Sequence, residues 1–323
     1  MAVSMKTSFE LDREQRLDIY MMTVQQVSRL NRVVNAGWFE EDGAVSFDPE
    51  TRDDRPLAGM RVVSLAQNLP GPVALSLLVA DGIEATKIEP PAGDMLRLGS
   101  PTWYAELTQG CSVRTLDLRS DEGRGELREL LASADLLLTS QRPSSLARIG
   151  ISSDALEALN PDLCWVEIVG DIEAPETPGH DLTYQLEAGL LAPPAMPRTL
   201  IADLAGAREA ARAAIALLLG RLRGSSARHR RVGLRQAAEA FAAPVKHGMT
   251  GDSGPLSGTM PVYRLYRLAD GWAAVAAIEP HFAAGFAREI GNEPETFFAR
   301  QTVADTTALA SAHDLPISAI PSS

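Results

Sequence analysis

From Pro56 onward the sequence alternates short apolar runs with stretches of helical periodicity, and this alternation limits the fold more than any other feature. The apolar runs, which are typical of buried strands, are residues 60–65, 85–89, 113–118, 136–139 and 164–169. Helical patterns occupy residues 73–80, 125–132 and 204–222. Strand and helix in repetition indicate a parallel sheet covered by helices on both faces. The sequence therefore predicts an α/β fold.

Changes in composition divide the chain into four parts. Apolar residues at three- and four-residue spacing predict a helix over 11–34, and an acidic stretch with Gly and Pro follows it. Near the other end, two alternating runs flank the turn at 269–271 and predict a β-hairpin, followed by a helix from Pro280. The predicted parts are an N-terminal helical extension and linker (1–55), a large domain (56–224), a second linker (225–254) and a small domain (255–323).

Charge and cysteine content exclude several classes of protein. The formal net charge of −12 argues against a nucleic-acid partner, because binding a phosphate backbone requires a concentrated positive surface. Cys111 and Cys164 are too few for a disulfide framework and lack the spacing of a zinc site. No leader pattern opens the sequence, and no apolar run is long enough to span a bilayer. We expect a cytoplasmic protein without a membrane partner.

The loop after the first predicted strand, residues 66–72, precedes a helix. Ligands of open α/β sheets usually lie at such a loop, because the helix that follows offers free N–H groups. This loop lacks the glycine pattern of a dinucleotide site, so NAD is disfavoured. The histidines at 229, 247, 281 and 313 lack metal-ligand spacing, and we expect no metal site.

Several motifs resemble those of one protein family. They are Pro56–Leu65, Pro70-Gly71-Pro72, the Lys-Ile-Glu-Pro-Pro-Ala-Gly-Asp segment at 87–94, Thr-Leu-Asp-Leu at 115–118 and Arg142-Pro143. With them, residues 56–320 resemble the family III CoA-transferases, which are the CaiB/BaiF-like proteins. The resemblance implies a Rossmann-like large domain with a smaller α+β domain, an acyl-CoA substrate and no cofactor beyond the CoA moiety. It also implies an interlocked homodimer, and it puts Arg142 and Arg148 near the CoA nucleotide.

Three later motifs are similar to the racemase branch of that family, the alpha-methylacyl-CoA racemases. They are Gly-His-Asp-Leu-Thr-Tyr at 179–184, Leu-Ile-Ala-Asp-Leu-Ala-Gly at 200–206 and Ala-Ile-Glu-Pro-His-Phe at 277–282. The histidine of the first motif and the glutamate of the third are typical of the racemases, whereas both branches of the family have an aspartate in the second motif. By this resemblance the candidate catalytic residues are His180, Asp203 and Glu279.

Racemisation beside a thioester requires those residue types. One group must remove the α-proton, and another must return it on the opposite face of the carbon. An imidazole changes protonation near neutral pH, so His180 suits one role, with Asp203 to orient it. Glu279 would serve the other face, supplied by the small domain or by a partner subunit. The enolate formed between the two transfers needs hydrogen-bond donors, and the helix beginning near Asp203 is the expected source.

Two other functions remain open. In a CoA-transferase, Asp203 would attack the thioester carbonyl and carry the acyl group. A relative that acts on a non-CoA or carrier-bound acyl substrate is also open, because Gly110–Val113 lacks basic residues that relatives have there and an acidic stretch, 171–178, replaces glycines. Without the resemblance, Asp203 and Glu279 would be interpreted as helix-start carboxylates.

Two further expectations concern the surface and the subunit contact. The basic run 221–231 is expected to be a solvated linker. The segment that relatives continue with after the small domain has no counterpart here, and the helix over 11–34 would replace it as a clasp between subunits.

Overall fold

The computed structural model describes residues 55–322, so the predicted helix over 11–34 and its clasp role lie outside the described residues. The described chain forms two compact units, one ending at Gly254 and the other beginning at Pro255. Each unit has its own sheet and its own hydrophobic core.

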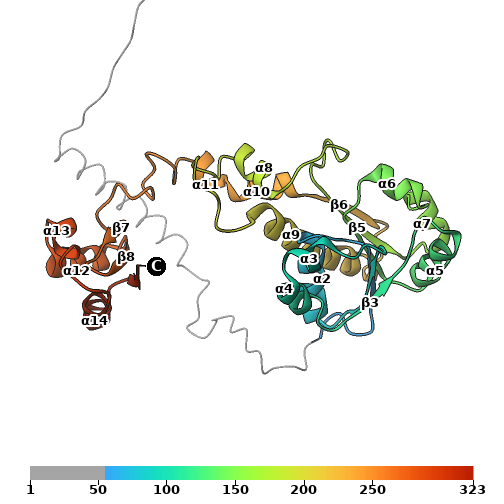
Figure 1. The fold of residues 1–323 in the computed structure, drawn as a ribbon, viewed down its shortest axis with the longest axis horizontal. Coiled ribbons are helices and arrows are strands. Elements are labelled where there is room, and N and C mark those ends of the chain that lie inside the picture. Colours follow the sequence, from blue (N-terminus) through green and yellow to red (C-terminus); the bar gives the residue numbers. More distant parts are fainter. Residues whose placement is uncertain (1–54, 323) are drawn as a thin grey trace, which may run out of the picture. The chain divides into compact units, whose positions relative to one another are not determined.

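A six-stranded parallel sheet forms the first unit (Figure 1). Its order is β3-β2-β1-β4-β5-β6, a doubly wound order, and the parallel sheet that the alternating pattern predicts is confirmed. The strands are β1 (Arg61–Ser64), β2 (Glu84–Glu89), β3 (Cys111–Thr115), β4 (Leu136–Thr139), β5 (Cys164–Val169) and β6 (His229–Gly233). β4 and β5 match their predicted ranges to the residue, because every position in both strands is buried.

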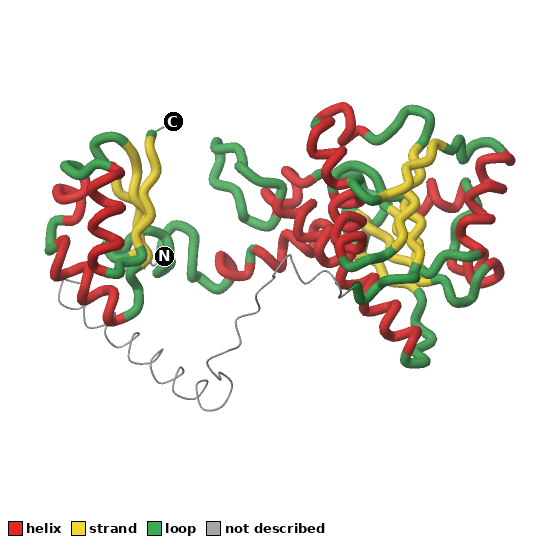
Figure 2. The backbone as a smooth tube through the Cα atoms, turned by 90° about the horizontal axis from the view of Figure 1, so that it is seen from below, coloured by secondary structure: helices red, strands yellow, loops and turns green. Residues whose placement is uncertain are grey.

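Helices cover both faces of this sheet (Figure 2). Val62, Leu136 and Leu138 pack on one face with α2 and α9, whereas the alternate residues Val63 and Leu137 pack on the other with α5, α6 and α7. The helices of the unit are α2 (Pro70–Ala80), α3 (Met95–Gly99), α4 (Pro101–Leu107), α5 (Asp121–Ala132), α6 (Pro143–Arg148), α7 (Ser153–Leu159), α8 (Asp181–Glu187), α9 (Ile201–Leu222), α10 (Leu234–Phe241) and α11 (Ala243–Lys246).

The sequence predicts a linker over 225–254, and this prediction is wrong. Residues 229–233 form β6, which pairs with β5 in parallel from Trp165↔His229 to Val169↔Gly233. The following helix α10 packs against α9 and α8. The apolar signal was weak because β6 is an edge strand whose side chains are largely exposed or half-buried.

The basic run 221–231 has structural partners, which corrects its prediction as a solvated linker. Arg221 pairs with Asp135 at 2.7 Å, and the Arg231 Nε donates to the buried carboxylate of Glu167 at 2.8 Å. His229 stacks on Trp165 with ring centroids 4.2 Å apart. The contacts of His229 and Arg231 join the edge strand to β5, and the Arg221–Asp135 pair joins the end of α9 to the residue before β4.

The second unit is a three-stranded antiparallel sheet with helices on one face (Figure 2). The predicted hairpin is confirmed as β7 (Tyr263–Arg267) and β8 (Gly271–Ala276), and β9 (Ile317–Pro321) pairs with β8. Its helices are α12 (Pro280–Ile290), α13 (Pro294–Phe298) and α14 (Val303–His313). Phe298 is fully buried in its core and stacks on Tyr266 with centroids 4.6 Å apart.

No helix of the described chain is both long enough and apolar enough to cross a bilayer. Within residues 55–322, no group of three or more His, Cys, Asp and Glu side chains is arranged to hold a metal ion.

Replacing Phe298 with alanine should destabilise the second unit by about 3–5 kcal/mol, because it opens a cavity in a small core. Phe297→Ala is the control, since that neighbouring ring is only partly buried and should cost less. Urea unfolding followed by fluorescence measures both. Equal losses would contradict the placement of Phe298 at the centre of this core.

Candidate active site

Two cavities open where the strands of the parallel sheet end. The sheet order reverses between β1 and β4, and ligands of doubly wound folds bind outside the strand ends at such a point. The smaller cavity has a volume of about 230 Å³. Its lining comes from the loops after β1, β4 and β5 and from α8, α9 and α10, and it includes Gln67, Asn68, Ser140, Gln141, Arg142, Gly170, Pro175, Thr177, Gly179, His180, Tyr184 and Asp203.

His180 and Asp203 line this same cavity although 22 residues separate them in the chain. His180 is the N-cap of α8, and its backbone N–H donates to the Thr183 hydroxyl at 3.2 Å. Asp203 lies in the first turn of α9. The structure therefore brings together two of the three predicted catalytic residues.

Asp181 ties the two helices together. Its side chain is 4% exposed, and one carboxylate oxygen accepts from the backbone N–H groups of Ala202 at 2.8 Å and Asp203 at 3.2 Å. The other oxygen accepts from the Gln185 amide. A carboxylate at a helix N-terminus satisfies N–H groups that lack partners within the helix. Asp181 thereby fixes α8, and the His180 before it, against the start of α9.

This contact corrects one prediction. The helix near Asp203 was expected to supply hydrogen-bond donors for an enolate, but Asp181 occupies the N–H groups of Ala202 and Asp203. This contact could not be predicted from the sequence, because Asp181 and Ala202 meet only in the folded chain. These two N–H groups are therefore not available to an enolate oxygen.

The carboxyl group of Asp203 has an unusual acidity. Burial, together with the negative charge of Asp181, raises the pKa of Asp203 from 3.8 to about 7. A group with a pKa near 7 can both accept and release a proton at neutral pH. The geometry therefore equips this cavity for proton transfer.

The larger cavity has a volume of about 670 Å³. Residues after β1, β2 and β3 line it, among them Glu89, Pro90, Pro91, Leu116, Asp117 and Arg119. Gln67 and Gln141 line both cavities, so the two are adjacent. A ligand with two parts could occupy both.

The predicted nucleotide-binding arginines lie close to these cavities. Arg142 is the N-cap of α6 and lines the smaller one. Arg148 is the last residue of α6, is exposed, and donates to the Ser145 hydroxyl, which belongs to a residue of the larger cavity. Both positions allow contact with a phosphate, but neither side chain is buried.

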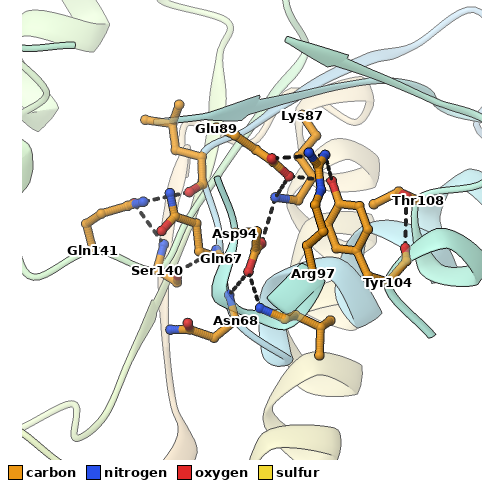
Figure 3. Close-up of polar contacts among 12 residues, drawn as sticks. Gln67, Asn68, Lys87, Glu89, Asp94, Arg97, Tyr104, Thr108, Ser140 and Gln141 are labelled. Atoms are coloured by element: carbon orange, nitrogen blue, oxygen red, sulfur yellow. Dashed lines mark hydrogen bonds and ion pairs between the residues drawn. The ribbon is translucent and has the colours of Figure 1, made fainter. Parts of the chain in front are cut away.

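A buried charged cluster supports the loop after β1, and sequence reasoning missed it (Figure 3). The fully buried Lys87 ammonium pairs with Asp94 at 2.8 Å and with Glu89 at 3.0 Å. Asp94 also accepts from the Asn68 backbone N–H at 3.1 Å. Asn68, at a φ of 61°, lies in the left-handed region that is costly for a side chain. The three charged residues lie in the 87–94 motif, but the motif does not show that their charges are buried and paired with one another.

Two more hydrogen bonds join this loop to the loop after β4 (Figure 3). The Gln67 backbone N–H donates to the Ser140 hydroxyl at 2.9 Å, and the Gln141 amide donates to the Leu65 carbonyl at 2.6 Å. The side walls of the cavities are therefore held by polar contacts between segments more than 70 residues apart.

The acidic stretch 171–178 forms part of the cavity wall through Pro175, Thr177 and Pro178. Asp171 anchors its start by accepting from the side chains of Gln236 at 2.6 Å and Arg235 at 3.0 Å. Glu176 accepts from the backbone N–H and the hydroxyl of Ser144 on α6. These contacts hold the segment that leads into His180.

Glu279 belongs to the second unit. It is the N-cap of α12, its side chain is exposed, and it forms no capping hydrogen bond. Its position at a helix start agrees with the structural interpretation offered by the sequence alone. Its catalytic role stays a prediction.

Comparisons with known proteins show which family the chain resembles in sequence. The profile of CoA-transferase family III matches residues 57–320. The chain is 30% identical over 198 residues to a probable fatty acyl-CoA transferase of Mycobacterium tuberculosis, Rv3272. The aligned residues make up 55% of this chain and 50% of that protein. It is 29% identical over 274 residues to the alpha-methylacyl-CoA racemase of Mus musculus. This alignment covers 77% of this chain and 68% of the racemase.

A third relative is the succinyl-CoA–D-citramalate CoA-transferase of Chloroflexus aurantiacus, 35% identical over 127 residues, or 37% of this chain and 32% of that protein. The chain spans half or less of the length of these first curated transferase relatives. The comparisons therefore contain both transferases and a racemase.

Solved structures agree with the fold. A crystal structure of the M. tuberculosis protein aligns with a TM-score of 0.72 at 25% identity and covers 82% of this chain and 83% of that one. A CaiB/BaiF family protein from Brucella suis aligns with a TM-score of 0.70 at 21% identity over 83% and 85%. The predicted resemblance and the α/β fold class are confirmed.

Replacing Lys87 with methionine should destabilise the first unit by about 3–5 kcal/mol, because it leaves Glu89 and Asp94 buried without their cation. Arg128→Met, at an exposed position on α5, is the control and should change stability by less than about 0.5 kcal/mol. Urea unfolding measures both. Similar values for the two variants would show that the cluster does not hold the loop.

Asp203→Asn should become progressively more stable than the wild type as pH rises from 4 to 7. The pKa of the Asp203 carboxyl is near 7 in the folded protein and near 3.8 in the unfolded chain. Rising pH therefore ionises this carboxyl in the unfolded chain first, which lowers the free energy of unfolding of the wild type but not of the variant. Above pH 7 the difference should level off. Urea midpoints at several pH values test this, with the exposed Asp154→Asn as a variant whose difference should not grow.

Proposed function

This chain belongs to CoA-transferase family III, and from that premise we propose that it is a racemase or epimerase of 2-methylacyl-CoA-like thioesters. The observation that carries the proposal is the cavity shared by His180 and Asp203. A racemase homologue that matches 77% of the chain supports it.

The proposed reaction begins with proton removal. The imidazole of His180 takes the α-proton, and the C–H electron pair moves into the bond between the α-carbon and the carbonyl carbon, which gives an enolate. Asp203, in the same cavity, stabilises and orients the imidazolium. The Asp203 pKa of about 7 keeps the pair able to exchange a proton near neutral pH.

The opposite face of the α-carbon needs a second acid. We assign this role to Glu279, which the second unit of the same chain or of a partner subunit would supply. A proton from Glu279 then inverts the centre, and the reverse reaction uses the two bases in the opposite order. The proposal includes the interlocked homodimer implied by the family.

The two adjacent cavities suit the two parts of an acyl-CoA. The larger one, after β1, β2 and β3, would take the nucleotide part, with Arg148 near its phosphates. The smaller one would take the thioester and the branched acyl carbon, with Gln67 and Gln141 at the junction. Arg142, which follows Gln141 and lines the smaller cavity, would lie near the pantetheine part that joins the two ends of the ligand.

CoA transfer is the second candidate. The named transferase relatives favour it, and Asp203 lies in the cavity where a carboxylate could attack a thioester carbonyl. That reaction releases CoA as its thiolate, leaves an acyl-aspartate anhydride, and gives no essential task to His180. A carrier-bound or non-CoA acyl substrate is a third candidate, because Arg119 at the larger cavity is already paired with Asp117.

Exchange of the α-proton decides among these functions. The wild type, incubated with a chiral 2-methylacyl-CoA in deuterium oxide, should incorporate one deuterium and lose optical purity, as followed by NMR. His180→Ala and Asp203→Asn should each slow exchange by about 10²–10⁴-fold, which is the usual contribution of an acid–base group. His247→Ala, outside the cavity lining, is the control.

Absence of exchange in the wild type, together with an acyl-aspartate trapped by hydroxylamine at Asp203, would establish transfer instead. If calorimetry detects no binding of CoA or of its thioesters, the carrier-bound or non-CoA function would take precedence.

A further inference from the structure

We propose that the hydroxyl of Tyr184 is a catalytic hydrogen-bond donor to the carbonyl oxygen of the acyl substrate. The inference rests on the proposed acyl-thioester chemistry and deepens it. Tyr184 lines the smaller cavity with His180 and Asp203. Tyr184 lies in α8, four residues after His180, which is the N-cap of that helix.

Two glycines make room for this hydroxyl. A Cβ atom added to Gly170 would lie 2.2 Å from the Tyr184 hydroxyl oxygen, and one added to Gly179 would lie 2.3 Å from it. Real Cβ atoms do not approach so closely, so any side chain at either position would displace the phenol. Gly170 directly follows β5, and Gly179 directly precedes His180. The hydroxyl is therefore positioned by backbone on two sides, close to a candidate catalytic residue.

The hydroxyl has an unused hydrogen-bonding capacity. The residue is buried, with 6% of it exposed, and no hydrogen bond within residues 55–322 involves the Tyr184 hydroxyl, although its oxygen is not fully enclosed. Because Tyr184 lines the smaller cavity, this oxygen is open to a ligand there. Burial, and secondly the charge of Asp203, raise the pKa of Tyr184 above its ordinary value, so the group stays neutral and able to donate at physiological pH.

The Tyr184 hydroxyl is a second source of donors beside α9, where two of the N–H groups already have a partner. Negative charge develops on the carbonyl oxygen when the α-proton leaves, and preorganised donors stabilise it. Asp181 occupies the N–H groups of Ala202 and Asp203, so these two groups at the start of α9 are not available for this role. The Tyr184 hydroxyl serves an enolate and also the tetrahedral oxyanion of a transferase, so the inference does not depend on which reaction occurs.

Tyr184→Phe isolates the hydroxyl, because phenylalanine keeps the ring between Gly170 and Gly179. We expect kcat to fall by about 10²-fold with a smaller change in KM, as for the loss of one oxyanion donor. Tyr263→Phe, which removes a hydroxyl from a residue outside the cavity lining, is the control and should leave kcat unchanged. An unchanged kcat in Tyr184→Phe would overturn the proposal, since a purely structural ring would tolerate this replacement.

Binding provides a readout that does not require turnover. The probes are a 2-methylacyl-CoA and the matching thioether, in which CH₂ replaces the carbonyl. Tyr184→Phe should weaken calorimetric binding of the thioester several-fold and leave thioether binding unchanged. Equal effects on both ligands would contradict the proposed contact.

The two experiments separate this inference from the proposed function. A wild type that binds the thioester but shows no proton exchange refutes racemisation, while the thioester and thioether comparison still decides the role of Tyr184. A wild type that binds neither probe overturns both.

Discussion

The candidate active site depends on one buried carboxylate. Asp181 accepts from two backbone N–H groups in the first turn of α9, and by doing so it fixes the start of α8 against the start of α9. His180 precedes Asp181 directly, and Asp203 is one of its donors. The same negative charge, after burial, helps to raise the pKa of Asp203. One contact thus determines both the placement of the pair and the acidity of one member.

Polar anchors also form the rest of the cavity wall. Lys87 and Asp94 hold the loop after β1, Ser140 and Gln141 join that loop to the one after β4, and Asp171 anchors the segment before His180. The Lys87–Asp94 contact is buried and the others are partly buried, and each joins segments that differ in the chain, so together they hold the loops in place. Apolar packing builds the sheet, whereas these contacts shape the space at its end.

The sequence patterns predicted the elements whose burial follows a local periodicity. The fully buried strands β4 and β5 were predicted to the residue, whereas β3, an exposed edge strand, begins two residues earlier than expected. β6 was missed because its basic side chains hid the strand pattern. His180 and Asp203 were identified through the family resemblance. Asp181, Lys87 and Tyr184 were missed because their roles arise from partners that are distant in sequence or from a shared cavity.

A crystal structure of the chain with a bound 2-methylacyl-CoA tests the central claim most directly. The account predicts the α-carbon within proton-transfer reach of the His180 imidazole, with the carboxylate of Glu279, from the same or a partner subunit, on the opposite face. The nucleotide would occupy the cavity lined by Pro90 and Leu116. An α-carbon remote from His180, or a carboxylate of Asp203 aimed at the thioester carbonyl carbon with Glu279 elsewhere, would contradict the account.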